Sequence, residues 1–557
     1  MRGAIGLVGL ALLAALAFLL RVQPSTADAG ARGGAYATLG DPEGDYRLRL
    51  VELALVTSHV PQRDRFLGLD ARSSSPPWPP LVHAALAVCF SYGLPRSEVA
   101  VELRGIEEAS LEGARMWIGP LLAALGVLGV GALALYFAQG HGSATAALIV
   151  GCVAALHPLG LARDFAGSLS AHGWIVLLSL AQVGALALAL RGTERVDAFV
   201  GALGGGFCAA IALLAGAEAW PVSAAVLAAF VHRALRAPRA QSRDPWRAVL
   251  AFVGTALAVL AIPREDEAPS LWMPDPDTGG LLHCAPDTLA LSLAPLACGL
   301  VLCWRTAREP LTATLLAANA LALACALVDR RFFAPLVATS LALLALALAR
   351  AALEERRSWS AALASIVVLA APALLRGRSD ACDPQALPHA LRWLRERSSS
   401  PGAFNHPEAE QSWRVAAPPA LAGSVALHAR RGVVGASFEG ARGPLSPALA
   451  AIFAATEPVE LAAALARADA PYLVVTPPML RDAELALAPG ALVARMLTQP
   501  HLDLAGALEA VYVSPQWITP EGERAEAGEV AGPAVAIYRR LGVRSAEDVP
   551  SLAPSAR

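Results

Sequence analysis

The sequence is 557 residues long, and 56% of its residues are hydrophobic while only 16% are charged. A soluble globular domain carries about 25% charged residues, so much of this chain must face something other than water. The net charge of -2 is close to zero and gives no indication of nucleic-acid binding, so we expect no nucleic-acid partner. The eight cysteines show no C-x-x-C spacing, which argues against a cysteine metal or redox site.

The first apolar stretch runs from Ala4 to Leu20 and is flanked by Arg2 and Arg21. This pattern fits either a signal peptide or a first membrane helix. No clean small-residue cleavage site follows it, and many apolar runs come later. We therefore favour an uncleaved helix whose N-terminus is cytoplasmic.

Further apolar runs are long enough to cross the hydrocarbon core of a bilayer, which is about 30 Å thick. They lie near residues 115–138, 144–161, 172–190, 196–214, 217–234, 246–262, 288–304, 310–328, 332–350 and 359–376. The sequence therefore predicts a polytopic α-helical membrane domain over residues 1–376, with about 11–13 transmembrane helices.

The short loops predict an orientation, because Arg accumulates on the cytoplasmic side of short connections. Alternation from a cytoplasmic N-terminus places all the Arg-rich short loops on that side, at 191–195, 233–247, 305–308 and 350–357. The other side receives the long loop 21–114, the loop after Gly160, the acidic loop 264–287 and the residues from 377 to 557. Any chemistry in those segments is expected to be extracytoplasmic.

The C-terminal residues 377–557 differ in character from the apolar part. Polar helical stretches at Leu387–Arg397 and Pro458–Arg467 alternate with β-like runs at Tyr472–Thr476 and Val535–Tyr538. This alternation predicts an extracytoplasmic α/β domain.

A dense cluster of charged residues lies in the first external loop, between Asp41 and Arg49. Its carboxylates are suited to a divalent cation and its arginines to phosphate. The alternative is a solvated segment in which Asp41 and Pro42 start an amphipathic helix on the membrane surface. The residues alone leave both interpretations open.

Two more polar clusters fall on the same predicted side. In the segment Arg163–His172, Ser168, Ser170 or His172 is either a helix cap or, for the histidine, a metal ligand. The turn Asp329–Phe332 carries paired guanidinium groups, which suit either a phosphate or lipid headgroups.

The order of these clusters resembles the catalytic subunit of oligosaccharyltransferases, which belong to the GT-C superfamily of glycosyltransferases. The family pattern Asp-Pro-x-x-x-Tyr-Arg is matched by residues 41–47, and a Trp-Pro-Pro-Leu element by Trp78–Leu81. The further matches are Arg163, Ala166, Gly167 and Ser168 in the second external loop, Arg331 in an external Arg-Phe turn, and the C-terminal stretches 431–434 and 470–475. The resemblance spans nearly the whole chain.

The sequence departs from this family at two motifs. Ser170-Ala171-His172 stands where the family has an acidic pair, so one carboxylate is missing and an imidazole replaces the other. Pro418–Ala422 stands where the family has Trp-Trp-Asp, the motif that holds the hydroxyl of the acceptor sequon. Recognition of Asn-x-Ser/Thr by the family's usual pocket is therefore not supported.

The resemblance implies a membrane glycosyltransferase that moves a glycan from a polyprenyl-(di)phosphate carrier to an acceptor, a protein in the family. The reaction would take place on the external face of a bacterial-type inner (plasma) membrane. It implies catalytic roles for Asp41, Glu265 and Glu267, and carrier-phosphate binding by Arg331, Arg47 and Arg163. It also implies a divalent cation, Mn²⁺ or Mg²⁺, held by Asp41, His172 and Asp164.

Two alternatives remain open. The first is a GT-C transferase whose acceptor is a lipid or a polysaccharide. The second is a non-catalytic relative that binds a lipid-linked glycan or scaffolds a membrane complex. If the protein is an active enzyme, we predict that Asp41, His172 and Arg331 line one cavity at the external membrane boundary.

We predict that reporter fusions will place the loop Arg233–Arg247 in the cytoplasm and the residues after about Arg378 outside it. The physical reason is the asymmetry of Arg among the short loops. Fusions of alkaline phosphatase and of a fluorescent protein at both positions measure this. A C-terminal fusion that is active only in the cytoplasm would contradict the orientation.

Overall fold

The computed structural model describes residues 2–22, 41–68, 80–96, 106–260, 309–353 and 385–541, with short gaps inside these ranges, and a few residues between 292 and 299. Contacts divide the chain into two compact units. Unit 1 comprises Met1–Arg32, Trp78–Val82 and Glu112–Gly377, and unit 2 comprises Gly33–Pro77, His83–Leu111 and Arg378–Arg557. Part of the first predicted loop thus belongs with the C-terminal residues.

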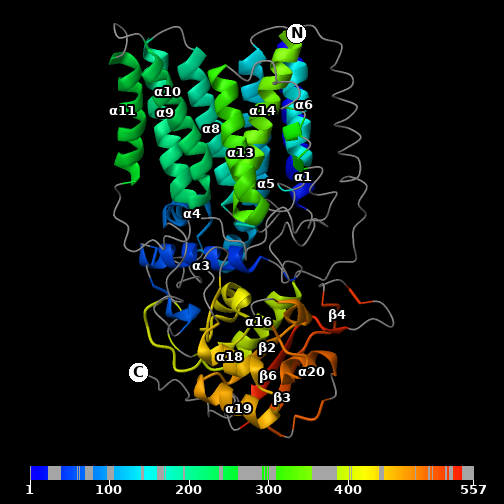
Figure 1. Ribbon diagram of the computed structural model, residues 1–557. Coiled ribbons are helices and arrows are strands. Elements are labelled where there is room, and N and C mark those ends of the chain that lie inside the picture. Colours follow the sequence, from blue (N-terminus) through cyan, green and yellow to red (C-terminus); the bar gives the residue numbers. More distant parts are fainter. Residues whose placement is uncertain are drawn as a thin grey trace. The chain divides into compact units, whose positions relative to one another are not determined.

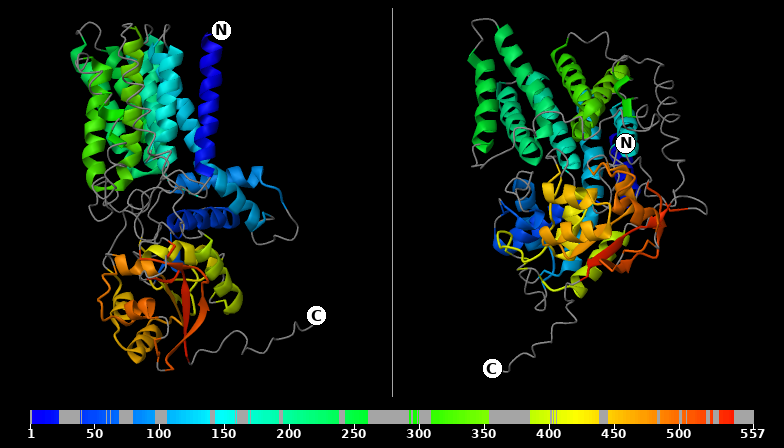
Figure 2. Two further views of the ribbon diagram at one scale, coloured as in Figure 1. Left: turned by 90° about the vertical axis from the view of Figure 1, so that its right-hand side faces the viewer. Right: turned by 60° about the horizontal axis from the view of Figure 1, so that its bottom comes forward.

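Unit 1 is built from long apolar helices that run side by side in Figure 1 and in the left view of Figure 2. They are α1 (Arg2–Val22), α5 (Glu108–Ala138), α6 (Ser143–Leu156), α8 (His172–Arg191), α9 (Arg195–Ala215), α10 (Trp220–Arg236), α11 (Arg243–Leu260), α13 (Pro310–Val328) and α14 (Phe333–Leu353). Among the described residues, five helices (α5, α8, α9, α13 and the α14 segment) are long and apolar enough to cross a membrane. The prediction of a multi-pass membrane protein is confirmed.

Parts of the predicted helix count cannot be compared with the structure. The apolar run at 359–376 lies outside the described residues, as does most of the run at 288–304. The predicted runs at 217–234 and 246–262 correspond to α10 and α11.

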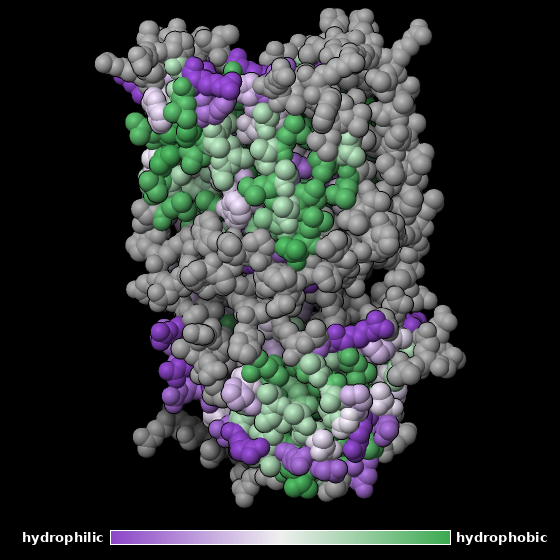
Figure 3. All heavy atoms as spheres, viewed as in Figure 1, coloured by the Kyte–Doolittle hydropathy of each residue, from purple (hydrophilic) through white to green (hydrophobic). Residues whose placement is uncertain are grey.

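The outer surface of unit 1 has the composition of a surface in contact with lipid. Figure 3 shows apolar residues over much of the helices that it draws in colour. On α9 the large exposed side chains lie at positions i, i+3, i+4, i+7 and i+11, which are Val196, Phe199, Val200, Leu203 and Phe207. Such a stripe on a long helix is stable in a bilayer but not in water.

Glycine allows α9 to pack closely against its neighbours α8 and α11. A Cβ atom at Gly206 would collide with the backbone carbonyl of Phe252 on α11, whereas one at Gly204 would meet no atom within 4 Å. Small residues at helix contacts let backbones approach in membranes, where water does not drive association. The glycine run on α9 therefore has a packing role, as its place in an apolar helix suggests.

Buried polar side chains link the helices of unit 1. The Asn319 amide of α13 donates to Thr339 Oγ1 at 3.0 Å and to Ser340 Oγ at 2.8 Å, both on α14. Ser223 of α10 donates to Gln182 Oε1 of α8 at 3.1 Å. Each such interhelical bond contributes about 0.6–2 kcal/mol in a membrane, so these bonds fix helix pairs and register.

The Arg-bearing ends of neighbouring helices meet within unit 1. Arg233 near the end of α10 donates to the Ala189 carbonyl near the end of α8. Arg350 near the end of α14 contacts Glu309 and Thr312 at the start of α13. These contacts agree with alternating helix directions, and the side of the membrane to which these ends belong stays a prediction.

Unit 2 contains a four-stranded sheet with the strand order β1-β2-β6-β3. Strands β1 (Val415–Ala416) and β2 (Tyr472–Val475) are parallel, whereas β6 (Ala536–Arg540) is antiparallel to β2 and to β3 (Leu508–Val513). Its helices include α3 (Pro42–Thr57), the three-residue turn η2 (Arg65–Leu67), α16 (Ala386–Arg397), α17 (Ala422–Ser424), η11 (Val425–Ala429), α18 (Pro447–Ala454), α19 (Pro458–Arg467) and α20 (Leu492–Thr498). The predicted C-terminal mixture of helices and strands is confirmed.

The remaining elements are short. Strands β4 (Trp517–Ile518) and β5 (Gly532–Pro533) form a separate pair, and helix α4 (Pro80–Gly93) lies in the first predicted loop. The turns η3 (Ala217–Ala219), η9 (Arg330–Phe332), η10 (Pro419–Leu421) and η12 (Pro477–Arg481) connect longer elements.

The packing of α9 predicts opposite effects for two neighbouring glycines. Gly206→Ala should lower the free energy of unfolding of the purified protein by about 1–3 kcal/mol, because the new methyl group meets the backbone of Phe252. Gly204→Ala is the matched control and should be neutral or stabilise by up to about 1 kcal/mol, because alanine favours a helix and the space is open. Equal effects of the two substitutions would contradict the packing.

Candidate functional site

Asp41 stands at the start of helix α3. Its Oδ1 atom accepts a hydrogen bond from the Gly44 N–H at 3.0 Å, and Pro42 occupies the first helical position. A side-chain cap of this kind contributes about 1 kcal/mol to a helix. The predicted helix start at Asp41 and Pro42 is therefore present, with a half-buried carboxylate at its tip.

Helix α3 is not an amphipathic helix on a membrane surface, which was one of the two interpretations of this segment. Every residue from Gly44 to Leu55 is buried. The helix packs against α17 and η11 of the same unit. Its charged residues are therefore held inside protein, and each needs a partner there.

Asp45 links α3 to the C-terminal residues of unit 2. Ser424 Oγ donates to Asp45 Oδ2 at 2.5 Å, and His428 Nε2 lies 3.4 Å from the same oxygen. Asp45 is one helical turn beyond Asp41, so these contacts fix the first turn of α3.

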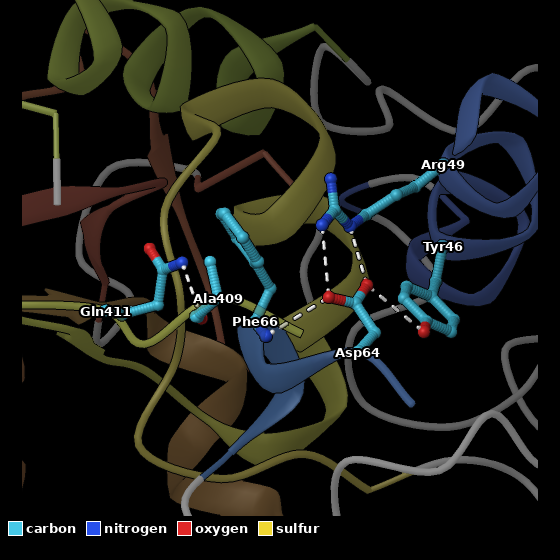
Figure 4. A network of polar contacts seen from close by, with 6 residues as sticks. All are labelled: Tyr46, Arg49, Asp64, Phe66, Ala409 and Gln411. Carbon is cyan, nitrogen blue, oxygen red and sulfur yellow. Dashed lines mark hydrogen bonds and ion pairs between the residues drawn. The ribbon is translucent and has the colours of Figure 1, made fainter. Parts of the chain in front are cut away.

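Arg49, one turn further along α3, forms a buried ion pair with Asp64. Its Nε and Nη2 atoms donate to the two carboxylate oxygens at 2.7 and 3.0 Å, and both side chains are completely buried. Figure 4 shows that Tyr46 and the Phe66 backbone also point at this carboxylate, with donor distances of 3.3 and 3.1 Å. Burial and the adjacent Asp64 charge raise the pKa of Tyr46, which therefore remains a donor.

Aromatic rings enclose the Arg49 guanidinium. Its central carbon lies 4.2 Å from the centre of the Phe66 ring and 4.3 Å from that of Phe404. Desolvated cation–π contacts of this kind contribute about 2 kcal/mol. The Phe66 carbonyl in turn accepts from the Val433 N–H at 2.7 Å, so η2 is bound both to α3 and to the C-terminal chain.

Gly423 permits a very close approach of the C-terminal chain to the first turn of α3. A Cβ atom at this position would collide with the Pro42 carbonyl and would lie 2.8 Å from Tyr46 Cβ. The segment Pro418–Ala422 precedes it directly. In oligosaccharyltransferases the Trp-Trp-Asp motif occupies the position of this segment. Here the segment leads directly to Gly423, which contacts the first turn of α3, the turn that Asp41 caps.

Glu52 lies near the other end of α3 and is almost completely buried, with an exposed fraction of 2%. Among the residues that the structure describes, its Oε2 atom has no hydrogen-bond partner. Arg395 and Arg430 both bind Glu108 instead, at 3.1 and 2.9 Å. Burial raises the pKa of Glu52 to about 7, against the opposing influence of Arg430.

Arg331 lies in the predicted turn between α13 and α14, in unit 1. Its Nε and Nη2 atoms donate to Asp329 Oδ2 at 2.9 and 2.7 Å, and both side chains are buried. Asp329 Oδ1 also accepts from the Arg331 backbone N–H at 2.9 Å. The predicted phosphate-binding guanidinium is therefore already paired with a carboxylate.

Of the other predicted site residues, the structure describes two, His172 and Arg47. His172 is buried at the start of α8, and Arg47 is buried on α3. Asp41 and Arg47 belong to unit 2 and His172 and Arg331 to unit 1, so their convergence on one cavity stays a prediction. The residues that lie outside the described part of the chain are Arg163, Asp164, Glu265 and Glu267.

The described residues do not by themselves form a metal centre. Among them, no group of three or more His, Cys, Asp or Glu side chains gathers where it would hold an ion. The ligand set Asp41, His172 and Asp164 therefore stays a prediction.

Several partners in this site carry no local sequence signal. Asp64 and Ser424 are single polar residues in ordinary surroundings, and only the folded chain brings them to α3. The spacing of Asp45, Arg49 and Glu52 is the signal that was present, because positions i, i+4 and i+7 share one face of a helix.

The comparisons with known proteins bear on the fold. No protein-family model and no curated protein matches the sequence. The solved structures that resemble this one include the apo oligosaccharyltransferase of Archaeoglobus fulgidus, with a TM-score of 0.65 and 14% identity over 96% of this chain and 88% of that one. This chain therefore has a fold similar to that of the archaeal oligosaccharyltransferase.

Two further structures of the archaeal oligosaccharyltransferase resemble the chain. One, in complex with Zn and sulfate, has a TM-score of 0.63 at 13% identity, over 96% of this chain and 88% of that one. The other holds an inhibitory peptide and a dolichol-phosphate and has a TM-score of 0.58 at 14% identity, over 98% of this chain and 75% of that one. At these identities the likeness concerns the fold, and the expected fold is confirmed.

The buried carboxyl group of Glu52 predicts a pH-dependent stability. Its pKa of about 7 in the folded protein exceeds the ordinary value of 4.5, so the contribution of Glu52 to stability is fully present below pH 4.5 and is lost as pH rises from 4.5 to 7. Glu52→Gln keeps the neutral form and should stabilise unit 2 at pH 8 by ~3 kcal/mol, with little effect near pH 4.5.

Urea unfolding of the protein in detergent, followed at several pH values, measures this difference. The exposed Glu396 on α16 offers a matched control, and Glu396→Gln should leave the pH dependence unchanged. A Glu52→Gln protein that is no more stable than the original at pH 8 would show that the carboxylate is well solvated or paired.

Proposed function

We propose that this chain is a membrane glycosyltransferase that moves a glycan from a polyprenyl-(di)phosphate carrier to an acceptor on the extracytoplasmic face of an inner membrane. The observation that carries the proposal is a fold similar to that of the archaeal oligosaccharyltransferase over nearly the whole chain, with Asp41 at the tip of a helix fixed by C-terminal residues. A related fold holds a dolichol-phosphate and a peptide in the archaeal protein, which supports a lipid-linked donor.

In this proposal Asp41 is the principal catalytic carboxylate. Its half-buried position at a fixed helix start would hold an acceptor nucleophile by a hydrogen bond and orient it toward the sugar. Glu265 or Glu267 of the acidic external loop would assist. A divalent cation, Mn²⁺ or Mg²⁺, held by Asp41, His172 and Asp164, would when bound neutralise charge on the departing phosphate.

Arginine side chains would hold the phosphates of the carrier, because guanidinium groups form charge-assisted hydrogen bonds with phosphate oxygens. Arg331 is the first candidate, with Arg47 and Arg163 assisting. Its pairing with Asp329 fixes the guanidinium in place and also lowers the net positive charge of the turn. A carrier phosphate would therefore share Arg331 with Asp329.

The acceptor is not expected to be selected through the hydroxyl of a sequon. Pro419, Leu421 and Ala422 are buried and apolar, and the next hydroxyl along the chain, on Ser424, donates to Asp45. This segment thus offers no polar side chain to a Ser or Thr of a peptide. The segment therefore favours none of the protein, lipid and polysaccharide acceptors over the others.

A non-catalytic relative is the second candidate. The observations that favour it are the absence of the acidic pair at Ser170–His172 and the ion pair that occupies Arg331. Such a protein would bind the lipid-linked glycan without transferring it.

We expect the purified protein to transfer glycan without the ~10⁴-fold preference for Asn-x-Thr over Asn-x-Ala peptides that a dedicated polar pocket supplies. The physical reason is that Pro418–Ala422 carries no side-chain hydrogen-bond partner for the hydroxyl. Paired peptides and a polyprenyl-linked donor in detergent with Mn²⁺ or Mg²⁺ measure this ratio. Lipid and polysaccharide acceptors are assayed in parallel.

The matched variant is Asp41→Asn, because asparagine caps a helix as well as aspartate but carries no charge. It should abolish transfer while leaving the unfolding midpoint unchanged. A strong preference for the Thr peptide would contradict the interpretation of Pro418–Ala422. Donor binding without transfer to any acceptor would favour the non-catalytic relative.

A further inference from the structure

Two arginines are held at the end of α8 in unit 1. Arg191, the last residue of α8, donates from Nη1 to the Phe137 carbonyl near the end of α5 at 3.2 Å. Its central carbon lies 5.2 Å from the centre of the Phe137 ring, so both contacts fix the guanidinium. Arg233 of α10 donates to the Ala189 carbonyl, which belongs to the same turn of α8 as Arg191. Both guanidinium groups therefore lie at one end of the same helix.

The positive charges of these two arginines have no carboxylate partner among the described residues. Glu309, at the start of α13, is paired with Arg350. A guanidinium has five N–H donors, and Arg191 and Arg233 each use one of them on a carbonyl. The end of a helix supplies a partial negative charge of only about one half. Both side chains are half-buried, so their remaining donors reach the surface and can bind an anion.

The surface beside these arginines is apolar, which favours a lipid over a soluble anion. On α10, Leu235 lies between Arg233 and Arg236 and is 69% exposed. Val196 and Phe199, in the first turns of α9, are exposed as well. In Figure 3 hydrophilic residues gather at the upper end of unit 1, and mostly apolar residues lie below them. Basic groups between the ends of membrane helices bind anionic headgroups in such surroundings.

We propose that Arg191 and Arg233 bind the phosphate of one anionic phospholipid of the phosphatidylglycerol type, whose acyl chains follow the exposed apolar residues of α9 and α10. Guanidinium groups form charge-assisted hydrogen bonds with phosphate oxygens, and one phosphate can accept from both arginines. The bound lipid would link the ends of α5, α8 and α10. The site contains none of the proposed catalytic residues, so its test needs neither donor nor acceptor.

The test compares the full chain with the double variant Arg191→Gln/Arg233→Gln, because the glutamine amide can still donate to a carbonyl but carries no charge. Native mass spectrometry in detergent measures binding of phosphatidylglycerol and of phosphatidylethanolamine with the same acyl chains. An arginine near an anionic lipid strengthens binding about fivefold, so the double variant should bind phosphatidylglycerol about 25-fold more weakly. Its preference for phosphatidylglycerol over phosphatidylethanolamine should disappear.

The matched control is Arg247→Gln, because Arg247 is exposed on α11 and is already paired with Asp244. This variant should keep the affinity of the original chain for phosphatidylglycerol. Equal binding of the two lipids by the original chain would overturn the proposal, and so would an unchanged preference in the double variant. Displacement of the lipid by millimolar glycerol phosphate would show a site for a soluble anion and would overturn it too.

A second measurement needs no variant and so remains decisive if the double variant does not fold. A phosphatidylglycerol that carries a diazirine in its headgroup is added to the original chain in vesicles and photolysed. It should label residues 187–191 of α8 and 231–236 of α10 several-fold more than the matching phosphatidylethanolamine does. Equal labelling by both lipids, or no labelling of these residues, would contradict the site.

Discussion

The buried ion pair between Arg49 and Asp64 is the interaction on which the arrangement of unit 2 depends. Two opposite charges are completely removed from water, and this desolvation is costly unless the geometry and the remaining hydrogen bonds are good. Here the contact is bidentate, two aromatic rings enclose the cation, and Tyr46 and the Phe66 N–H also bind the anion. The pair thereby fixes α3, η2 and Phe404 together.

The position of the proposed catalytic carboxylate follows from this pair. Because α3 is rigid, fixing Arg49 also fixes the turn two helical repeats earlier, which Asp41 caps. Gly423 then lets the C-terminal chain contact that turn, and Ser424 binds Asp45. A side chain from the N-terminal loop and a segment far along the chain therefore form one surface.

Local patterns in the sequence predicted much of this architecture. The start of α3 at Asp41 and Pro42, the apolar helices and the turn at Asp329 all depend on neighbouring residues. The burial of α3 was not predictable, because a segment rich in both charges resembles a solvated surface helix. Its partners Asp64, Ser424 and His428 approach only through the fold. The pairing of Arg331 with Asp329 is local, because the two residues are two positions apart in one turn.

The buried pair of Arg49 and Asp64 holds α3 to the rest of unit 2. Its most direct test compares Asp64→Asn with Glu410→Gln, because Glu410 forms an exposed ion pair with Arg65, the residue next to Asp64. Urea unfolding should show a loss of about 3–5 kcal/mol for Asp64→Asn and at most about 1 kcal/mol for Glu410→Gln. Backbone amides of α3 should also lose protection from hydrogen exchange only in Asp64→Asn. Equal, small losses and unchanged exchange protection of α3 would show that the Arg49–Asp64 pair does not hold this helix.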